Sequence, residues 1–314
     1  MLTLGIDTSN YATSLAVFDT DAGEVVCDCK KFLPVKEGQL GLRQSDALFH
    51  HTAALPAMLA ELGARADLTR VRAVGVSARP RPVEGSYMPC FLAGVSAATA
   101  FSLSRALPLI ELTHQQGHIA AALYAAGDFT LFERESLVFH VSGGTTDLLL
   151  CHGAERITPL GTSQDLYAGQ AVDRLGVKLG YPFPAGVYVS EQAAQCTEKV
   201  HPKVSVKGVN CSLSGLENQC RKRLEQGEPP EDVAKFCLLT VAETVIAMTK
   251  EAQERYGRLP VLYAGGVMSN QLIRPLLAEN AVCWFAAPEF ACDNAAGVAV
   301  YGAWRKQGGK LWQF

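Results

Sequence analysis

The segment LTLGIDTSNYATSLAVFD at residues 2–19 decides the fold, because it reads as two strands around a polar turn. Leu2 to Asp7 is an apolar run, Thr8 to Tyr11 is polar, and Thr13 to Asp19 is again rich in apolar and β-branched residues. Turn residues between two such runs predict a β-hairpin. The tip of this hairpin would carry the polar side chains of Asp7, Thr8 and Ser9.

The same pattern returns in the middle of the chain, in the segment LVFHVSGGTTDLLLC at residues 137–151. Leu137 to Val141 reads as a strand, Ser142 to Asp147 as the turn, and Leu148 to Cys151 as the second strand. A supersecondary unit that recurs in one chain predicts a duplicated fold. Each half would open with a hairpin whose tip faces a shared cleft.

Strand and helix patterns alternate around the two hairpins, which predicts α/β layers with a mixed sheet in each of two lobes. We place the lobes at residues 1–127 and 128–314, with the last helix packing back on the first lobe. The expected helices are Ser45–Leu62, Tyr87–Ala106, His114–Ala125, Asp232–Arg255, Ser269–Leu277 and Asp293–Trp304, and the further strands are Val71–Ser77, Pro108–Leu112 and Val261–Ala264.

Composition places the chain among ordinary globular proteins. Hydrophobic residues make up 48% and charged residues 19% of its 314 residues, which is enough apolar surface for two cores. The net charge of −3 argues against a strongly basic nucleic-acid binder, although a local basic patch stays compatible with it. The chain lacks a leader-like start and an apolar run of about 18 residues, so we predict that it does not enter a membrane. Ten scattered cysteines without a CxxC pair are typical of a reducing compartment. We therefore predict a cytoplasmic protein, and we expect a bacterial origin.

Two glycine turns are candidates for binding phosphate. Ser142-Gly143-Gly144-Thr145-Thr146 joins two strands, and glycine lets backbone N–H groups approach an anion closely. Gly265-Gly266 ends a strand and opens onto a helix, where Asn270 is placed to bond a ribose or phosphate. Each turn by itself also fits a tight turn with no ligand. Together with Asp7, Thr8 and Ser9 they predict a site for a phosphate-bearing ligand, although neither a Walker motif nor GxGxxG is present.

His114 and His118 form the sharpest candidate site. Residues at i and i+4 share one helix face, so both imidazoles can reach one divalent ion. A zinc protease needs His-Glu-x-x-His with the glutamate as general base, and Gln115 in that position excludes this class. The alternative is a pair of polar histidines near a helix start that bind no metal.

A third ligand is available in Asp293, which opens the last predicted helix and is also suited to cap it. A His₂Asp set fits iron or zinc. Asp173, beside its candidate ion-pair partner Arg174, reads either as a site residue or as part of a solvated helix face.

Several motifs in order along the chain resemble those of the TsaD family, which is similar to the catalytic subunits of the archaeal and eukaryotic KEOPS complex. The resemblance runs from Leu4 to Trp304. It is carried by Gly5–Ser9, His114–His118, Val141–Gly144, Ala168–Asp173, Ser212–Leu216, Gly265–Asn270 and Asp293–Ala296.

The resemblance implies a two-lobed actin-like, sugar-kinase-like (ASKHA) fold around a nucleotide cleft. It implies an enzyme that moves a threonylcarbamoyl group from its adenylate to N6 of the tRNA adenosine beside the anticodon. His114, His118 and Asp293 would hold one divalent metal ion, iron or zinc. An ATP- or adenylate-type ligand would lie on Ser142–Thr146, Asp173, Gly186 and Asn270. The implied partners are tRNA and the small proteins of a TsaD-type complex, or a second copy of the chain.

The chain also departs from that family's pattern. Thr145 stands where the family has histidine, and the acidic pair after the first turn is missing. The other departures from the family residues are Leu166 for Asp, Gln170 for Glu, Arg174 for Lys and Glu217 for Lys. These changes suggest a divergent bacterial paralogue. The alternatives are therefore a regulatory or scaffold protein that binds nucleotide and metal, and a carbamoyltransferase or kinase with another acceptor.

Overall fold

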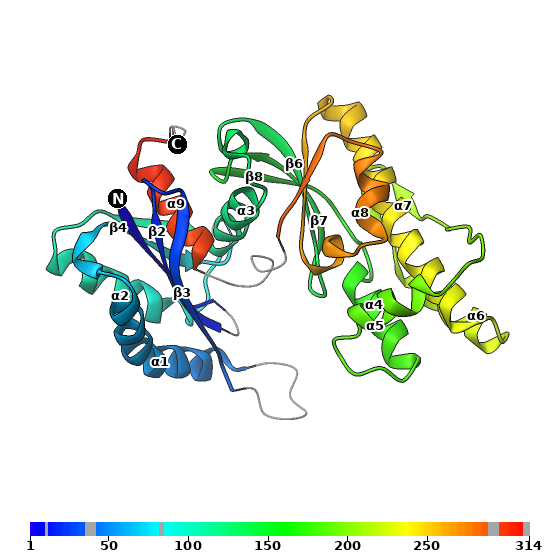
Figure 1. Cartoon of the computed structure of the whole chain (residues 1–314), viewed down its shortest axis with the longest axis horizontal. Helices are drawn as coiled ribbons and strands as arrows, with labels where there is room; N and C mark the ends of the chain where they lie inside the picture. Colours follow the sequence, from blue (N-terminus) through cyan, green and yellow to red (C-terminus); the bar gives the residue numbers. More distant parts are fainter. Residues whose placement is uncertain (10–11, 35–41, 82–84, 288–294, 310–314) are drawn as a thin grey trace. The chain divides into compact units, whose positions relative to one another are not determined.

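A computed structural model describes residues 1–9, 12–34, 42–81, 85–287 and 295–309. The chain divides into two units (Figure 1). The first comprises Met1–Arg134, His152–Ile157 and Glu289–Phe314, and the second comprises Glu135–Cys151 and Thr158–Pro288.

The first unit is built on a five-stranded sheet in the order β3-β2-β1-β4-β5. The predicted hairpin is its centre, because β1 pairs with β2 in antiparallel register from Leu2 opposite Asp19 to Asp7 opposite Ser14. β4 and β5 extend the sheet in parallel and β3 closes the other edge in antiparallel register. The strands are β1 (Leu2–Asp7), β2 (Ala12–Asp19), β3 (Glu24–Phe32), β4 (Val71–Arg79) and β5 (Leu109–Thr113).

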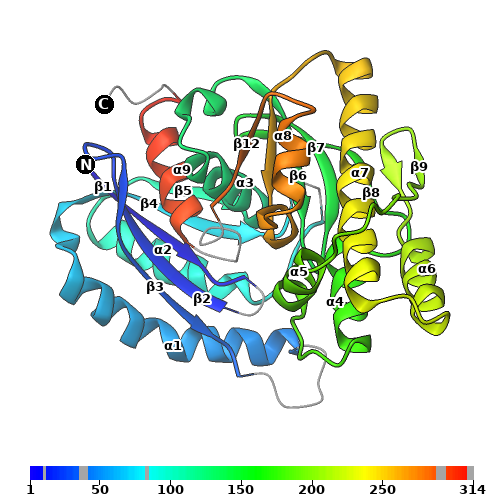
Figure 2. The ribbon, with the colours of Figure 1, turned by 45° about the vertical axis from the view of Figure 1, so that its right-hand side comes forward.

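Helices cover both faces of this sheet (Figure 2). α1 (Gln44–Arg65) and α2 (Phe91–Ser104) pack on one face, in an apolar cluster that includes Leu4 and Ile6. α3 (His114–Ala125) and α9 (Ala296–Lys306) pack together, and α9 lies against β1, β4 and β2.

Glycines let α9 approach its neighbours at backbone distance. A Cβ built on Gly5 would lie 2.4 Å from the Ala295 carbonyl oxygen, and one on Gly75 would lie 2.6 Å from that of Val298. On the helix itself, a Cβ on Gly297 would lie 2.0 Å from the Gly117 carbonyl oxygen of α3. Distances this short exclude any side chain, so glycine at these positions fixes α9 against β1, β4 and α3.

The second unit repeats the same sheet, in the order β8-β7-β6-β11-β12. β11 pairs in parallel with β6 and β12, as β4 does with β1 and β5. β6 and β7 are neighbours joined by a tight turn, which only antiparallel strands allow. The strands are β6 (Glu135–Val141), β7 (Thr146–His152), β8 (Arg156–Thr162), β11 (Val261–Ala264) and β12 (Cys283–Phe285).

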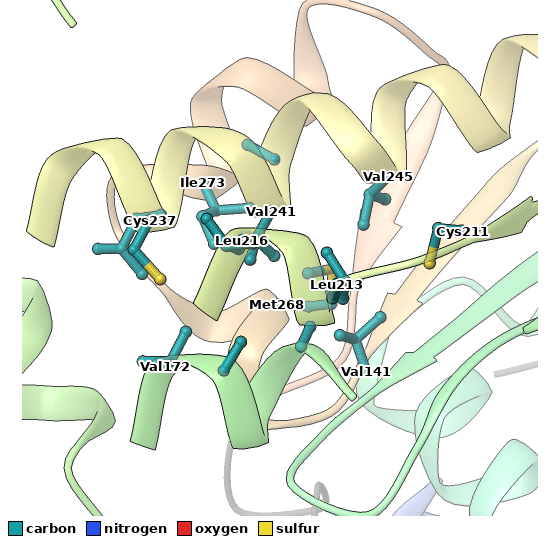
Figure 3. Close-up of a cluster of buried hydrophobic side chains, with 14 of the residues drawn as sticks. Val141, Val172, Cys211, Leu213, Leu216, Cys237, Val241, Val245, Met268 and Ile273 are labelled. Carbon is teal, nitrogen blue, oxygen red and sulfur yellow. The ribbon is translucent and has the colours of Figure 1, made fainter. Parts of the chain in front are cut away.

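The core of the second unit lies between β6 and a group of helices (Figure 3). Val172 of α4, Leu216 of α6 and Val241 of α7 converge there. The helices are α4 (Ala168–Lys178), α5 (Gly186–Ala194), α6 (Ser214–Glu225), α7 (Pro230–Tyr256) and α8 (Ile273–Ala278), and two short strands, β9 (Val206–Lys207) and β10 (Asn210–Cys211), precede α6.

The predicted α/β class with a duplicated mixed sheet is confirmed. The helix predicted at His114–Ala125 is observed with these bounds. The last helix, predicted to begin at Asp293, begins at Ala296. The helix predicted at Ser269–Leu277 is observed as α8, which a 3₁₀ turn at Gly266–Ser269 precedes. Every described cysteine is a free thiol, and all but Cys283 are buried, as expected of core residues. Among the described residues, every helix is too short or too polar to span a bilayer.

Candidate functional site

The histidine pair lies in the first turns of α3, directly after β5. Thr113 caps this helix, because its Oγ1 accepts the N–H of Gln116 at 3.1 Å and the Gln116 side chain accepts the N–H of Thr113 at 2.9 Å. This reciprocal capping box fixes where the helix starts. It thereby fixes which face carries His114 and His118.

The two imidazoles point their Nε2 atoms at each other, 2.8 Å apart. Two ligands at about 2.05 Å from a tetrahedral metal lie about 3.3 Å apart, so the rings would have to separate by about 0.5 Å and turn their Nε2 lone pairs toward the ion. Both rings are partly exposed, and they line a pocket with Asp7, Gly117, Ala121 and Val298. The chemistry and convergence of these nitrogens fit a zinc or iron site.

The third predicted ligand, Asp293, lies outside the described residues. Within the described ranges, no group of three His, Cys, Asp or Glu side chains is arranged to hold a metal ion. The described part of α9 begins at Ala296, three residues after Asp293, and its Gly297 contacts α3 at Gly117, between the two histidines.

Asp7, at the end of β1, is buried and bonds within the protein. Its Oδ2 accepts the Ser9 hydroxyl at 2.8 Å and lies 3.4 Å from Nδ1 of His114. Its Oδ1 accepts the N–H of Ser9 at 3.2 Å. The residue predicted to contact a nucleotide is therefore the neighbour of the metal-ligand candidate His114.

Thr8 is also buried, with its hydroxyl engaged by the start of α2. It donates to the Cys90 carbonyl at 3.1 Å and accepts the N–H of Gly94 at 3.0 Å. These bonds tie the end of β1 to α2. The hairpin residues Asp7, Thr8 and Ser9 are each at most 1% exposed, so their polar atoms serve the protein's own contacts.

The Ser142–Thr145 turn of the second unit is accessible at its tip. Gly143 and Gly144 are exposed, and Ser142 and Thr145 are partly exposed. The N–H of Ser142 donates to the Thr145 carbonyl at 2.9 Å, and the two hydroxyls lie 3.0 Å apart. Thr146 is buried, with its hydroxyl accepting the N–H of Ala168 at 2.8 Å. It therefore anchors α4 to the turn.

The start of α4 packs directly on this turn. The N–H of Gly169 donates to the Ser142 carbonyl at 3.2 Å, and a Cβ on Gly169 would lie 2.5 Å from the Gly143 nitrogen. One turn later, Asp173 accepts the N–H of Ala185 through Oδ1 at 2.8 Å, beside the start of α5 at Gly186. The glycine turn, the positive end of α4 and a partly exposed carboxylate thus lie together.

The other glycine turn is held by packing. Gly265 has φ of 98°, and a Cβ there would lie 2.2 Å from the Val141 carbonyl oxygen of β6. Gly266 is exposed. The Asn270 side chain bonds the backbone that leads into α8, because its Oδ1 accepts the N–H groups of Leu272 at 2.9 Å and Ile273 at 3.2 Å, and its Nδ2 donates to Ser190 at 3.1 Å.

Two charged contacts were not foreseen from the sequence. Arg174 pairs with Glu217 of α6 at 2.8 Å rather than with Asp173. Asp165 accepts the N–H groups of Leu213 at 2.7 Å and Ser214 at 3.2 Å, and the Ser214 hydroxyl. Burial alone would raise the pKa of Asp165, but these bonds together lower it. The partners lie 43 and 48–49 positions away, so local patterns carry no signal for them.

Solved structures with little sequence identity share the fold. HypF of T. kodakarensis superposes with a TM-score of 0.60 at 14% identity, covering 98% of this chain and 47% of that one. A ROK family protein from Streptococcus pneumoniae superposes with a TM-score of 0.58 at 12% identity, covering 98% and 100%. The expected sugar-kinase-like, ASKHA-type fold is thereby confirmed.

Curated relatives match over nearly the whole chain. A tRNA N6-adenosine threonylcarbamoyltransferase of Methanopyrus kandleri is 29% identical, covering 96% of this chain and 87% of the relative. One of Archaeoglobus fulgidus is 28% identical, covering 96% and 90%. The family model TsaD, described as tRNA N6-adenosine threonylcarbamoyltransferase, matches residues 36–300. The chain therefore belongs to the TsaD family.

Proposed function

We propose that this protein is an enzyme that transfers a threonylcarbamoyl group from its adenylate to N6 of an adenosine in tRNA. The observation that carries the proposal is the convergence of His114 and His118 on α3, in a chain that belongs to this family. A tRNA substrate supports the predicted place of action, the cytoplasm. Partner proteins of a TsaD-type complex, or a second copy of the chain, would complete the active assembly.

The first unit would hold the metal ion, zinc or iron, through Nε2 of His114 and Nε2 of His118. Asp293 would be the third ligand, since three residues span at most about 11 Å and α9 contacts α3 from its first turn. When bound, such an ion acts as a Lewis acid on carbonyl and phosphoryl oxygens. The capped start of α3 keeps both imidazoles on one face of the helix, where they can bind the same ion.

The second unit would hold the adenylate. The exposed glycines and the hydroxyls of Ser142 and Thr145 suit a phosphate beside the N-terminus of α4, where the helix dipole favours negative charge. The partly exposed carboxylate of Asp173 is suited to accept bonds from ribose hydroxyls. Gly186 and Gly266 would leave room for the nucleoside, while Gly265 and Asn270 shape the backbone around it.

Complementation tests the transfer. The gene would be expressed in a strain depleted of its own TsaD-type enzyme, and the threonylcarbamoyl nucleoside in digested tRNA would be measured by mass spectrometry. We expect the nucleoside to return with the wild type and to stay absent with His118→Ala expressed at the same level. A well-expressed wild type that restores none, with or without its partner proteins, would overturn the proposal.

A regulatory nucleotide- and metal-binding paralogue is the second candidate. It is favoured by one observation: Glu217 stands in place of a family lysine and pairs with Arg174 of α4, so an acidic side chain lies where the family has a basic one. A purified protein that binds ATP and zinc but transfers nothing to any tRNA would support this candidate. Transfer to another acceptor, detected with labelled ATP, would instead indicate a carbamoyltransferase or kinase.

A further inference from the structure

The carboxylate of Asp7 is buried beside the histidine pair, with a side chain only 1% exposed. A buried carboxylate requires hydrogen-bond donors. Ser9 supplies two, one to each oxygen, and Nδ1 of His114 lies 3.4 Å from Oδ2, at the outer limit of a hydrogen bond. Asp7 therefore contacts His114 on the side of the ring that faces away from His118.

This arrangement selects one tautomer of His114. A carboxylate oxygen accepts hydrogen bonds, so the contact between Oδ2 of Asp7 and Nδ1 of His114 places the ring proton on Nδ1. Nε2 of the same ring is then left with its lone pair, which is the form that binds a metal. In the 2.8 Å contact between the two rings, the hydrogen consequently comes from His118.

We propose that Asp7 is a positioning residue for the metal site, which holds His114 in the metal-binding tautomer, and that Ser9 holds Asp7 in turn. This inference rests on the metal site proposed above. It gives Asp7 and Ser9 a task other than contact with the nucleotide. Carboxylates that bond the far nitrogen of a metal-bound histidine orient the ring and raise its basicity, and their loss weakens metal binding by about 10- to 100-fold.

The substitution Asp7→Asn reverses the tautomer without changing the shape of the side chain. The Ser9 N–H donates to the position of Oδ1, which keeps the amide oxygen of an asparagine there and places its NH₂ group at the position of Oδ2. That group donates to Nδ1 of His114 and moves the ring proton to Nε2. The lone pair needed for the metal is then lost.

The affinity for Zn²⁺, measured by competition with a chromophoric chelator, tests the inference. We expect Asp7→Asn to weaken binding by about 10- to 100-fold. Ser9→Ala should weaken it by less than about tenfold, as for one lost hydrogen bond. The matched control is Asp19→Asn, which removes a carboxylate of β2 that bonds the N-terminus, and which should stay within about twofold of the wild type.

Nitrogen NMR of the histidines in the metal-free wild type reads the tautomer directly, independently of metal binding and of activity. A protonated Nδ1 in His114 that shifts to Nε2 in Asp7→Asn supports the inference. Unchanged tautomer and unchanged Zn²⁺ affinity in Asp7→Asn overturn it.

Two further outcomes separate the claims. If the wild type binds neither zinc nor iron, the metal site itself fails, and the tautomer still decides the role of Asp7. If Asp7→Asn does not fold, the tautomer of His114 in the wild type and the Zn²⁺ affinity of Ser9→Ala test the role of Asp7 instead. A wild-type His114 protonated at Nε2, or a Ser9→Ala protein that binds Zn²⁺ as the wild type does, then overturns the inference.

Discussion

Replacing Gly297 with alanine would push α9 and α3 apart at the centre of the histidine site. The new Cβ would lie 2.0 Å from the Gly117 carbonyl oxygen and 2.7 Å from the Ala121 nitrogen. Ordinary contacts between carbon and oxygen are about 3.3 Å, so the helices would have to separate by about 1.3 Å. Both atoms belong to the backbone of α3, which has little room to move.

The cost follows from these distances. Overpacking costs about 1–3 kcal/mol, and the rigid contact places Gly297→Ala near 3 kcal/mol. Alanine regains about 1 kcal/mol of helix propensity, which leaves a net loss of about 2 kcal/mol. For a unit of this size, that lowers the melting temperature by about 4–8 °C.

Gly302→Ala is the matched control on the same helix. Its Cβ would meet Thr3 Cγ2 at 3.2 Å and Gly75 Cα at 3.3 Å, which small shifts relieve. The gain in helix propensity should then leave its stability near that of the wild type. Thermal unfolding followed by circular dichroism compares the three proteins. If Gly297→Ala melts together with Gly302→Ala, the backbone contact between α9 and α3 does not exist in solution.

Three more measurements test other parts of the structure. The bonds that lower the pKa of Asp165 below 3.8 stabilise the protein at pH above that value, and this stabilisation is lost as the pH falls through the lowered pKa. In urea unfolding, Asp165→Asn should therefore be less stable than the wild type at pH 7, and the stabilities of the two proteins should converge in acid. A difference in stability that does not depend on pH would contradict this. The Arg174–Glu217 pair has side chains 55% and 38% exposed, so a double-mutant cycle with alanine should give a coupling below about 1 kcal/mol, and a larger value would show that the pair is shielded from solvent. If the proposed metal site is occupied, dialysis against a chelator should lower the melting temperature of the wild type by mass action but not that of His118→Ala, and equal shifts would place the metal elsewhere.

Local sequence patterns were sufficient to predict the two hairpins and the duplicated sheet. The apolar runs on either side of Thr8–Tyr11 and Ser142–Thr145 predict strands, because one or both faces of a strand in a sheet must be buried. β3 was not predicted, since only Cys27 and Cys29 of this edge strand are buried and its other residues are polar or at least partly exposed. Edge strands carry such residues because they need not fit a core.

Local sequence patterns could not predict which residues the site residues contact. The sequence pointed to Asp7 and Asn270 as ligand contacts because Asp7 ends a strand before a polar turn and Asn270 follows the glycine turn after another strand. In the structure Asp7 meets His114 and Asn270 meets Ser190, residues far away in the chain. Contacts of this kind depend on how helices stack on the sheets, and no periodicity in one segment encodes them.

The packing of α9 determines which of the two units can complete its folding first during synthesis. β1, β2 and β4 leave the ribosome early, yet the helix that covers them is encoded after the entire second unit. The second unit has all its strands and helices available before α9 emerges, so it is free to finish folding while the first sheet still exposes apolar surface around Gly5 and Gly75. The half of the protein that is made first is therefore the half that is completed last.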